Sequence, residues 1–373
     1  MRIAYVLTSL GMGGAEKQVV ALAARMAERG HTVSLISVMG RKAEEWPAPV
    51  EVLYLNIRKT PWSAWSGLMR ARAFLRDFCP NIVHSHSFHA NMLARLLVLL
   101  APRTAVISTI HNVYEGGVLR MLAYRFTDRL CLRTIAVSQA AAEHFIGLGA
   151  VQAERSVIVT NGIDTQEFSP DRERRARMRQ EMGVNSRFVW LASARIVAAK
   201  DYPNLLRALV ILGESHSHMQ VWIAGGWADR EMERLIELPE FHQVEPIVRW
   251  LGLRRDLPAL LDAADGFVSS SAWEGMPLAV GEAMAMEKQV VATDVGGVRE
   301  LVGYEGRLVP PRNPVALAAA MREVMQTNVS AGIARGRESR ERICSCFSMN
   351  TKPLEWERLY REALSGNRPA ADG

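Results

Sequence analysis

The chain has 373 residues, of which 49% are apolar, and it carries a formal net charge of +6. That length is more than one hydrophobic core usually organises, so we expect two domains. The four cysteines lack the spacing of a zinc site, and no apolar run reaches the roughly 18 residues that span a bilayer. These features argue against a zinc-stabilised, disulfide-stabilised or integral membrane protein.

The sequence begins with a strand-like segment that enters a glycine-containing loop, without an export signal. We therefore expect a cytoplasmic protein, with attachment to the inner face of the cell membrane as the alternative. The basic excess lies within residues 1–160, which hold 18 Lys and Arg against 10 Asp and Glu. This asymmetry favours an anionic partner for the first half, and we expect no nucleic-acid partner.

Short apolar segments alternate with segments of helical periodicity along the first half. The first strand is predicted at 2–9 and the first helix at 15–29. Further strands are expected at 32–38, 82–84, 105–109, 134–137 and 157–160. Buried strands separated by helices form a parallel sheet with helices on both faces. Residues 1–165 are therefore predicted to form a Rossmann-like domain.

The segment 58–78 has the composition of a basic amphipathic helix. Its apolar residues alternate with basic ones: Trp62, Trp65, Leu68, Met69, Phe74 and Leu75 among Arg58, Lys59, Arg70, Arg72 and Arg76. Such a helix can lie in an anionic membrane interface. A surface helix packed on the first sheet has a similar pattern. Both interpretations remain open at this point, and a peripheral membrane contact is a hypothesis.

The alternation starts again in the second half. Residues 161–185 are rich in charge and contain Gly162, Pro170 and Gly183, so we interpret them as a linker with one short helix. Strands are then expected at 188–193, 220–224, 247–251, 266–269, 289–293 and 306–309. Residues 186–350 are predicted to form a second Rossmann-like domain.

The segment 269–285 holds two glutamates, Glu274 and Glu282, which are eight positions apart. Pro277 suits the first turn of a helix, which places Glu274 in the preceding loop and Glu282 inside the helix. The free N–H groups at a helix start bind anions. Two carboxylates beside an anion site suit a ligand with both phosphate and hydroxyl groups, such as a nucleotide sugar.

This segment resembles the Glu-x7-Glu motif of retaining glycosyltransferases with the GT-B fold, and the closest resemblance is to their family 4. The resemblance extends from Gly11 to about Pro311, and landmarks occur in family order: Gly13-Gly14-Ala15-Glu16, Thr109-Ile110-His111, Ser138, Asn161 to Asp164, Arg195 with Lys200, Gly225-Gly226, Trp250 to Gly252, the glutamate pair, Asp294 to Gly297, and Pro310-Pro311. It implies two Rossmann-like domains facing a cleft. It also implies that the last helix, at about 352–365, crosses back to the first domain.

The resemblance assigns Arg195 and Lys200 to the leaving group. A diphosphate gains negative charge as the glycosidic bond breaks, and fixed cations stabilise that transition state more than the ground state. The alternative is ordinary solvated charge. The family usually has glycine before this arginine and after this lysine, whereas this chain has Ala194 and Asp201. These two departures leave the loop shape open, and the carboxylate of Asp201 would weaken the local positive field.

The resemblance also assigns the donor-binding residues. Glu282 would accept the ribose hydroxyls, since a carboxylate takes two hydrogen bonds well, and Glu274 would meet the hydroxyls of the donor sugar. The structural alternatives are a surface charge for Glu282 and a helix cap for Glu274. The remaining residues expected at the donor are Gly225, Gly275, Met276, Pro277 and Leu278.

Three residues of the first half complete the expected site. His111 would lie beside the donor sugar, and Gly13 and Gly14 would let backbone approach the donor or the acceptor. The alternatives are a structural histidine at a strand end and a tight strand-to-helix turn. His84, His86 and His89 have no carboxylate in a metal-site spacing. We therefore expect no metal and no other cofactor.

The sequence predicts a retaining hexosyltransferase that moves a sugar from a nucleotide sugar, with UDP preferred on family frequency, to a saccharide or lipid-linked acceptor in polysaccharide or glycoconjugate biosynthesis. Three rivals remain: a sugar-nucleotide epimerase of GT-B architecture, a dinucleotide-dependent oxidoreductase, and a noncatalytic nucleotide-sugar-binding partner. The oxidoreductase is disfavoured because the glycine loop lacks the dinucleotide fingerprint. The paired carboxylates alone would also suit a hydrolase.

Overall fold

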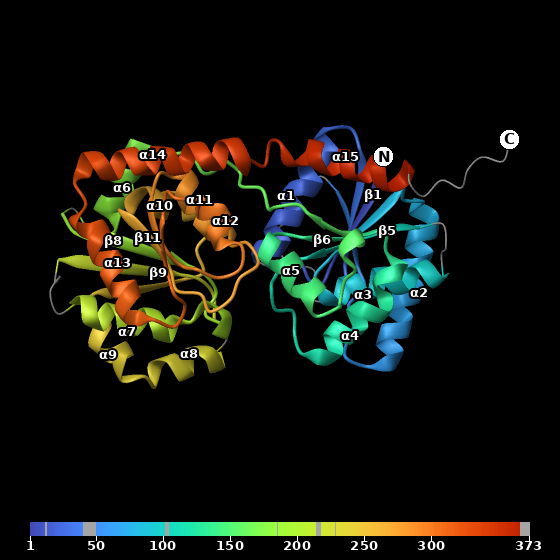
Figure 1. Ribbon diagram of the computed structural model, residues 1–373, viewed down its shortest axis with the longest axis horizontal. Coiled ribbons are helices and arrows are strands. Elements are labelled where there is room, and N and C mark those ends of the chain that lie inside the picture. Colours follow the sequence, from blue (N-terminus) through green and yellow to red (C-terminus); the bar gives the residue numbers. More distant parts are fainter. Residues whose placement is uncertain are drawn as a thin grey trace. The chain divides into compact units, whose positions relative to one another are not determined.

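The computed structural model describes residues 1–11, 13–39, 50–100, 104–184, 186–213, 218–227 and 229–365. The chain divides into two compact units (Figure 1). Unit 1 comprises Met1–Gly162 together with Met349–Gly373, and unit 2 comprises Ile163–Ser348. Each unit is a parallel sheet covered by helices, which confirms the predicted pair of Rossmann-like domains.

Unit 1 contains a seven-stranded parallel sheet in the order β3-β2-β1-β4-β5-β6-β7. Its strands are β1 (Arg2–Leu7), β2 (Thr32–Ser37), β3 (Glu51–Tyr54), β4 (Ile82–His86), β5 (Ala105–Ile110), β6 (Arg133–Ala136) and β7 (Ser156–Ile158). The central strands are buried along their length, which explains their nearly continuous apolar runs. Strand β3 was not predicted from the sequence, because it is short and only half-buried at the sheet edge.

Helices cover both faces of this sheet. Helices α1 (Gly14–Glu28) and α15 (Lys352–Ser365) pack on one face, and α2 (Pro61–Phe78) and α3 (Phe88–Leu100) pack on the other. The remaining elements of unit 1 are α4 (Val118–Thr127), η1 (Asp128–Leu130), α5 (Gln139–Gly147) and η2 (Ala153–Arg155). Figure 1 shows α2, α3 and α4 on the opposite side of the sheet from α15.

The last helix belongs to unit 1, as the resemblance implied. Trp356 and Tyr360 of α15 are buried against the first sheet. Glu357 bonds to Arg29 at 2.5 Å and to His31 at 2.9 Å, so α15 is tied to the end of α1. The arginine and histidine lower the pKa of Glu357 to about 2.

Helix α2 buries part of its apolar side against the sheet. Ala71, Leu75 and Phe78 are buried in the core beneath the helix, whereas Trp62 and Trp65 at its start remain exposed. The apolar side of the second half of the predicted amphipathic helix therefore packs on the sheet, and the large apolar side chains that stay exposed lie at its beginning.

Unit 2 contains a six-stranded parallel sheet in the order β10-β9-β8-β11-β12-β13. Its strands are β8 (Phe188–Ser193), β9 (Met219–Ala224), β10 (Val248–Gly252), β11 (Gly266–Ser269), β12 (Gln289–Thr293) and β13 (Arg307–Val309). Its helices are α6 (Arg172–Glu181), η3 (Ala198–Lys200), α7 (Tyr202–Gly213), α8 (Asp229–Ile236), α9 (Pro239–Val244), α10 (Leu257–Ala263), α11 (Leu278–Ala285), α12 (Val298–Val302), α13 (Pro314–Gln326) and α14 (Val329–Cys346). Helices α7, α9 and α13 share one buried core on the sheet.

The segment interpreted as a linker is part of unit 2. Helix α6 packs against α10, and its arginines bind the carboxylates at the end of that helix. Arg174 pairs with Asp262, while Arg175 and Arg179 approach Asp265 at 2.5 and 3.0 Å. Three of the charges that led to the interpretation as a linker are therefore paired with carboxylates far along the chain, which the local pattern does not contain.

Among the helices that the structure describes, none has the length and apolar character needed to cross a membrane.

Candidate functional site

The strand order of unit 2 reverses between β8 and β11. From β8 the chain proceeds outward through β9 to β10, and from β11 it proceeds in the other direction to β13. Open α/β sheets bind ligands outside the carboxyl ends of the strands at such a switch point. The loop after β8 carries Arg195 and Lys200, and the loop after β11 carries Glu274.

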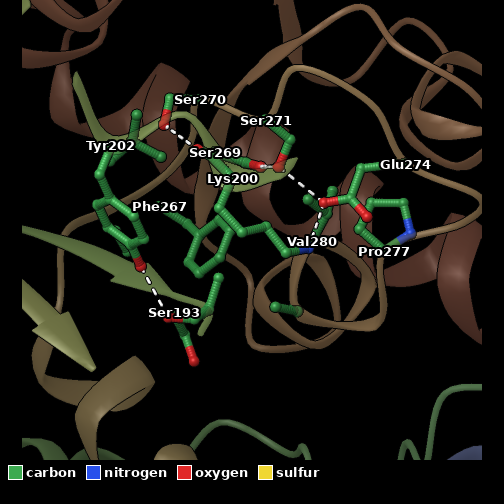
Figure 2. Close-up of a pocket in the computed structure, with 14 residues that line it drawn as sticks. Ser193, Lys200, Tyr202, Phe267, Ser269, Ser270, Ser271, Glu274, Pro277 and Val280 are labelled. Carbon is green, nitrogen blue, oxygen red and sulfur yellow. Dashed lines mark hydrogen bonds and ion pairs between the residues drawn. The ribbon is translucent and has the colours of Figure 1, made fainter. Parts of the chain in front are cut away.

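A small pocket of about 20 Å³ lies between these two loops (Figure 2). It is lined by Ala192, Ser193, Ala194, Lys200, Tyr202, Phe267, Val268, Ser269, Ser270, Ser271, Glu274, Pro277, Ala279 and Val280. The pocket therefore joins the predicted leaving-group loop to the start of α11.

Lys200 and Glu274 form an ion pair across the pocket. The ammonium group of Lys200 bonds to Oε1 of Glu274, and the hydroxyl of Ser271 donates to the same oxygen at 2.7 Å. Glu274 is buried, and its Oε2 accepts no hydrogen bond from the described residues. Figure 2 shows that second oxygen turned away from Lys200, so one oxygen fixes the side chain while the other is available to a ligand hydroxyl.

Two further hydrogen bonds join the two loops. The hydroxyl of Ser270 donates to the carbonyl of Lys200, and the N–H of Ala272 donates to the carbonyl of Ala199, both at 2.8 Å. Thr293 of β12 donates to the carbonyl of Ser271 at 2.6 Å. The Lys200–Glu274 pair is thus held by a rigid surrounding frame.

Arg195 differs from Lys200 in its surroundings. Its side chain is exposed, and it makes no hydrogen bond or ion pair with the described residues. Its loop is shaped by Gly225, because a Cβ there would lie 1.9 Å from the carbonyl oxygen of Ala194. Tyr202 donates to that same carbonyl at 2.8 Å. Gly225 therefore positions the arginine loop by close packing.

Gly296 supports the other loop. Its φ of +53° lies in the region that favours glycine, and a Cβ there would lie 1.9 Å from the carbonyl oxygen of Glu274. The next residue, Gly297, donates its N–H to the carbonyl of Gly275 at 2.6 Å. The loop after β12 therefore fixes the backbone that carries Glu274.

Helix α11 begins directly after Pro277, as predicted. Met276 and Pro277 are buried in the preceding loop, and Leu278 is the first helical residue. Glu282 lies inside the helix and is buried, so the interpretation of this residue as a solvated surface charge is wrong.

The backbone explains one departure from the family pattern. Asp201, which stands where the family usually has glycine, has a φ of +46°. This left-handed conformation is one that glycine adopts without strain and aspartate tolerates better than most residues. Asp201 therefore adopts a backbone conformation that a glycine at this position would also adopt without strain.

Unit 1 has its own switch point, between β1 and β4. His86 ends β4 and His111 follows β5, and their Nδ1 and Nε2 atoms lie 3.0 Å apart. Burial lowers the pKa of His111 to about 4, so its imidazole is neutral at pH 7. Glu115 accepts the backbone N–H of His111 at 3.2 Å, and burial raises the pKa of this carboxyl to about 7.

Close packing explains the glycine at position 13, directly before α1. Gly13 is the N-cap of the helix, and a Cβ at this position would lie 2.2 Å from a carboxylate oxygen of Glu16. Gly14 is the first helical residue and is exposed. Gly13 thus leaves room for the Glu16 side chain, which also accepts a bond from Ser9 at 3.3 Å.

Two family models match the chain. The model of Glycosyltransferase Family 4 matches residues 12–167, and the model of Glycosyl transferases group 1 matches residues 187–327. The chain belongs to glycosyltransferase family 4. It is a glycosyltransferase of the GT-B type, and the two matches correspond to its two Rossmann-like domains.

The names of individual relatives of this family 4 glycosyltransferase describe different activities. Glycogen synthase of Mycobacterium tuberculosis (strain H37Rv) is 28% identical over 313 residues, which cover 79% of this chain and 71% of the relative. The Escherichia coli UDP-Gal:alpha-D-GlcNAc-diphosphoundecaprenol alpha-1,3-galactosyltransferase is 26% identical over 60% of each chain. The crystal structure of Anabaena HepE with UDP and glucose has a TM-score of 0.85 at 22% identity and covers 97% of this chain and 100% of its own. The last similarity shows the fold.

Sequence reasoning missed several supporting residues of this glycosyltransferase. Ser271, Tyr202 and Gly296 all fix the candidate site, and Glu115 contacts the backbone of His111. Ser271 stands three positions before Glu274, which was the available signal. Gly296 was recognised only as part of a family landmark, because its contact partner is distant in the chain.

The three histidines of strand β4 and its vicinity serve different purposes. His84 is buried and bonds to Tyr360 and Thr109, each at 2.7 Å. His86 bonds to His111, and His89 is exposed at the start of α3. The part of the chain that the structure describes contains no group of three or more His, Cys, Asp or Glu side chains arranged to hold a metal ion.

The buried histidines make stability depend on pH. Burial lowers the pKa of His84, His86 and His111, so these groups bind protons more readily in the unfolded chain. Their stabilisation of the folded chain is complete above about pH 6.5 and is progressively lost as the pH falls below that value, because the unfolded chain then takes up protons that the buried imidazoles resist. Glu115 acts in the opposite direction, because its stabilisation is lost as the pH rises from about 4.5 to 7. We expect the urea concentration at the midpoint of unfolding to decrease when the pH is lowered from 6.5 to 5.0. The destabilisation by the three histidines outweighs the stabilisation by the one carboxyl.

A variant pair tests this dependence. His86→Asn should reduce the difference between the two midpoints, whereas His242→Asn, which removes an exposed histidine, should leave it unchanged. An identical pH dependence in wild type and His86→Asn would contradict the assignment.

Proposed function

We propose that this glycosyltransferase is a retaining hexosyltransferase that uses a nucleotide sugar, with UDP as the nucleotide, and a saccharide or lipid-linked acceptor in polysaccharide or glycoconjugate biosynthesis. The observation that carries the proposal is the placement of Lys200 and Glu274 at the switch point of unit 2, beside the unpaired Arg195. The ammonium of Lys200 and the guanidinium of Arg195 suit the diphosphate of a donor, and the Glu274 oxygen that accepts no hydrogen bond suits the hydroxyls of its sugar.

The cations serve the leaving group in this proposal. As the bond between the anomeric carbon and the diphosphate oxygen breaks, its electron pair passes to that oxygen. Arg195 and Lys200 stabilise the developing charge, and Lys200 is already oriented by Glu274. The acceptor oxygen attacks from the face that the diphosphate leaves, so the anomeric configuration is retained. The acceptor proton passes to the departing phosphate, which removes the need for a separate base.

The carboxylates serve the donor. The free Oε2 of Glu274 accepts sugar hydroxyls, and Glu282 accepts the ribose hydroxyls. The N–H groups of Met276 and Leu278 bind sugar or phosphate, and Gly275 and Pro277 shape the loop that leads into α11. Gly225 contributes by shaping the Arg195 loop.

The roles of unit 1 rest on the family resemblance. We assign His111 to the catalytic set as a neutral imidazole that positions the reacting groups, and Gly13 and Gly14 to donor binding. No metal and no other cofactor enters this proposal. All four cysteines are free thiols, which supports a reducing, cytoplasmic setting.

Nucleotide release from a panel of UDP-, GDP- and ADP-sugars tests the proposal. We expect slow hydrolysis of one donor, accelerated by a suitable acceptor. This hydrolysis should be lost in Glu282→Ala, because the variant lacks both carboxylate oxygens that accept hydrogen bonds from the ribose hydroxyls. Glu338→Ala, which removes an exposed carboxylate of α14, is the matched control and should release nucleotide at the wild-type rate.

Each other outcome has a meaning. Donor binding without release in the presence of lipid-linked and saccharide acceptors would indicate a noncatalytic binding partner. Conversion of the donor sugar to its epimer would indicate an epimerase. Failure to bind any of these nucleotide sugars would overturn the proposed activity.

A further inference from the structure

Helix α4 presents an apolar face to solvent. Leu119, Leu122 and Phe126 follow each other at helical spacing and are 83%, 40% and 78% exposed, and Val118 beside them is 75% exposed. The opposite side of the helix is fixed to the domain by the buried Tyr124. Soluble proteins rarely leave several large apolar side chains side by side in water, and such patches usually bind something.

The exposed face continues over the neighbouring helices. Helix α3 packs against both α2 and α4, and the pKa of His89 at its start is lowered by burial and by the nearby positive charges of Arg120 and Lys59. The start of α2 and the start of α4 therefore flank the same end of α3. We define the α2–α4 surface by its exposed apolar residues: Trp62, Trp65, Leu96, Leu99, Val118, Leu119, Leu122 and Phe126.

The charges around this surface are almost entirely positive. The segments that form it carry seven exposed basic side chains: Arg58, Lys59, Arg70, Arg72, Arg76, Arg125 and Arg129. Within 56–78, 88–100 and 114–130, all of which the structure describes, there are three carboxylates. Asp77 pairs with Arg76, Glu115 accepts from Tyr124, and Asp128 is buried. No carboxylate in these segments is left to balance the cations.

We propose that the α2–α4 surface binds an anionic lipid bilayer. Tryptophan favours the membrane–water interface, aliphatic and phenyl side chains enter the acyl boundary, and arginines at the rim meet lipid phosphates. A second copy of this chain fits less well, because a symmetric contact would bring the same positive rim against itself. The binding does not depend on the proposed catalytic activity. It also differs from the contact predicted over 58–78, because the structure buries much of that helix and adds α4 to the surface.

Co-sedimentation of the full chain with lipid vesicles tests this inference. We expect binding to vesicles of phosphatidylcholine and phosphatidylglycerol at a 7:3 ratio, and at least about tenfold weaker binding to phosphatidylcholine alone. Binding should weaken when the salt concentration rises, because the rim charges are exposed to screening. The variant Leu119→Ser/Leu122→Ser/Phe126→Ser should bind at least about tenfold more weakly, because its apolar contact is lost.

A matched control replaces exposed apolar residues of unit 2. The variant Val315→Ser/Val329→Ser/Ile333→Ser removes comparable exposed side chains and should bind vesicles as wild type does. Arg125→Gln/Arg129→Gln should weaken binding about fivefold for each charge removed. Trp62→Ala/Trp65→Ala changes another helix, so it tests the same surface even if the triple α4 variant does not fold.

Three results would overturn the inference. The first is equal binding to neutral and anionic vesicles, and the second is wild-type binding by both the α4 and the α2 variants. The third is a wild-type protein that binds no vesicles and forms a dimer in solution, which the α4 variant converts to a monomer.

Discussion

Arg195→Ala is expected to lower kcat/KM for sugar transfer by about 100- to 1,000-fold, because one of two cations at the leaving group is lost. The thermal midpoint should stay at the wild-type value, since the Arg195 side chain is exposed and has no partner among the described residues. Steady-state nucleotide release and thermal unfolding of the same preparations provide the measurement.

Two further variants sharpen this test. Arg335→Ala removes an exposed arginine of α14 and should change neither quantity. Lys200→Ala should show a comparable loss of activity together with a lower thermal midpoint, because it leaves the buried Glu274 without its cation. Full activity of Arg195→Ala would remove this residue from the catalytic set.

Gly296→Ala is expected to lower activity by about 100-fold through displacement of Glu274. The added Cβ would lie 1.9 Å from the carbonyl oxygen of Glu274, so the backbone carrying the carboxylate must shift. A misplacement of about 1 Å at a reacting group can cost a factor of this size. The positive φ adds a stability cost of roughly 1–3 kcal/mol.

Gly183→Ala separates the two effects. Gly183 also has a positive φ, of +65°, but a Cβ there meets no atom within 4 Å. This variant should lose stability through backbone strain alone and keep its activity per folded molecule. Equal specific activities in Gly296→Ala and Gly183→Ala would show that Gly296 does not position Glu274.

The sequence by itself determined the architecture and the location of the candidate donor site. Apolar strands alternating with helical segments indicate parallel sheets, because burial on both faces leaves a continuous apolar run in each strand. The placement of Glu274 before α11 and of Glu282 inside it followed from Pro277, whose preference for a helix start is a property of its own ring. These features are local, so they can be deduced from a short stretch of chain.

Only the tertiary structure decided which of these residues meet. Lys200 and Glu274 are 74 positions apart, and the strand order places their loops side by side at the reversal between β8 and β11. The same dependence on distant partners explains why the segment that contains α6 was interpreted as a linker and why the support from Gly296 was missed. It also explains the α2–α4 surface, because periodicity shows that a helix has an apolar face and only packing shows whether that face is covered. Pairing across long separations is set by topology, and topology is a property of the whole fold.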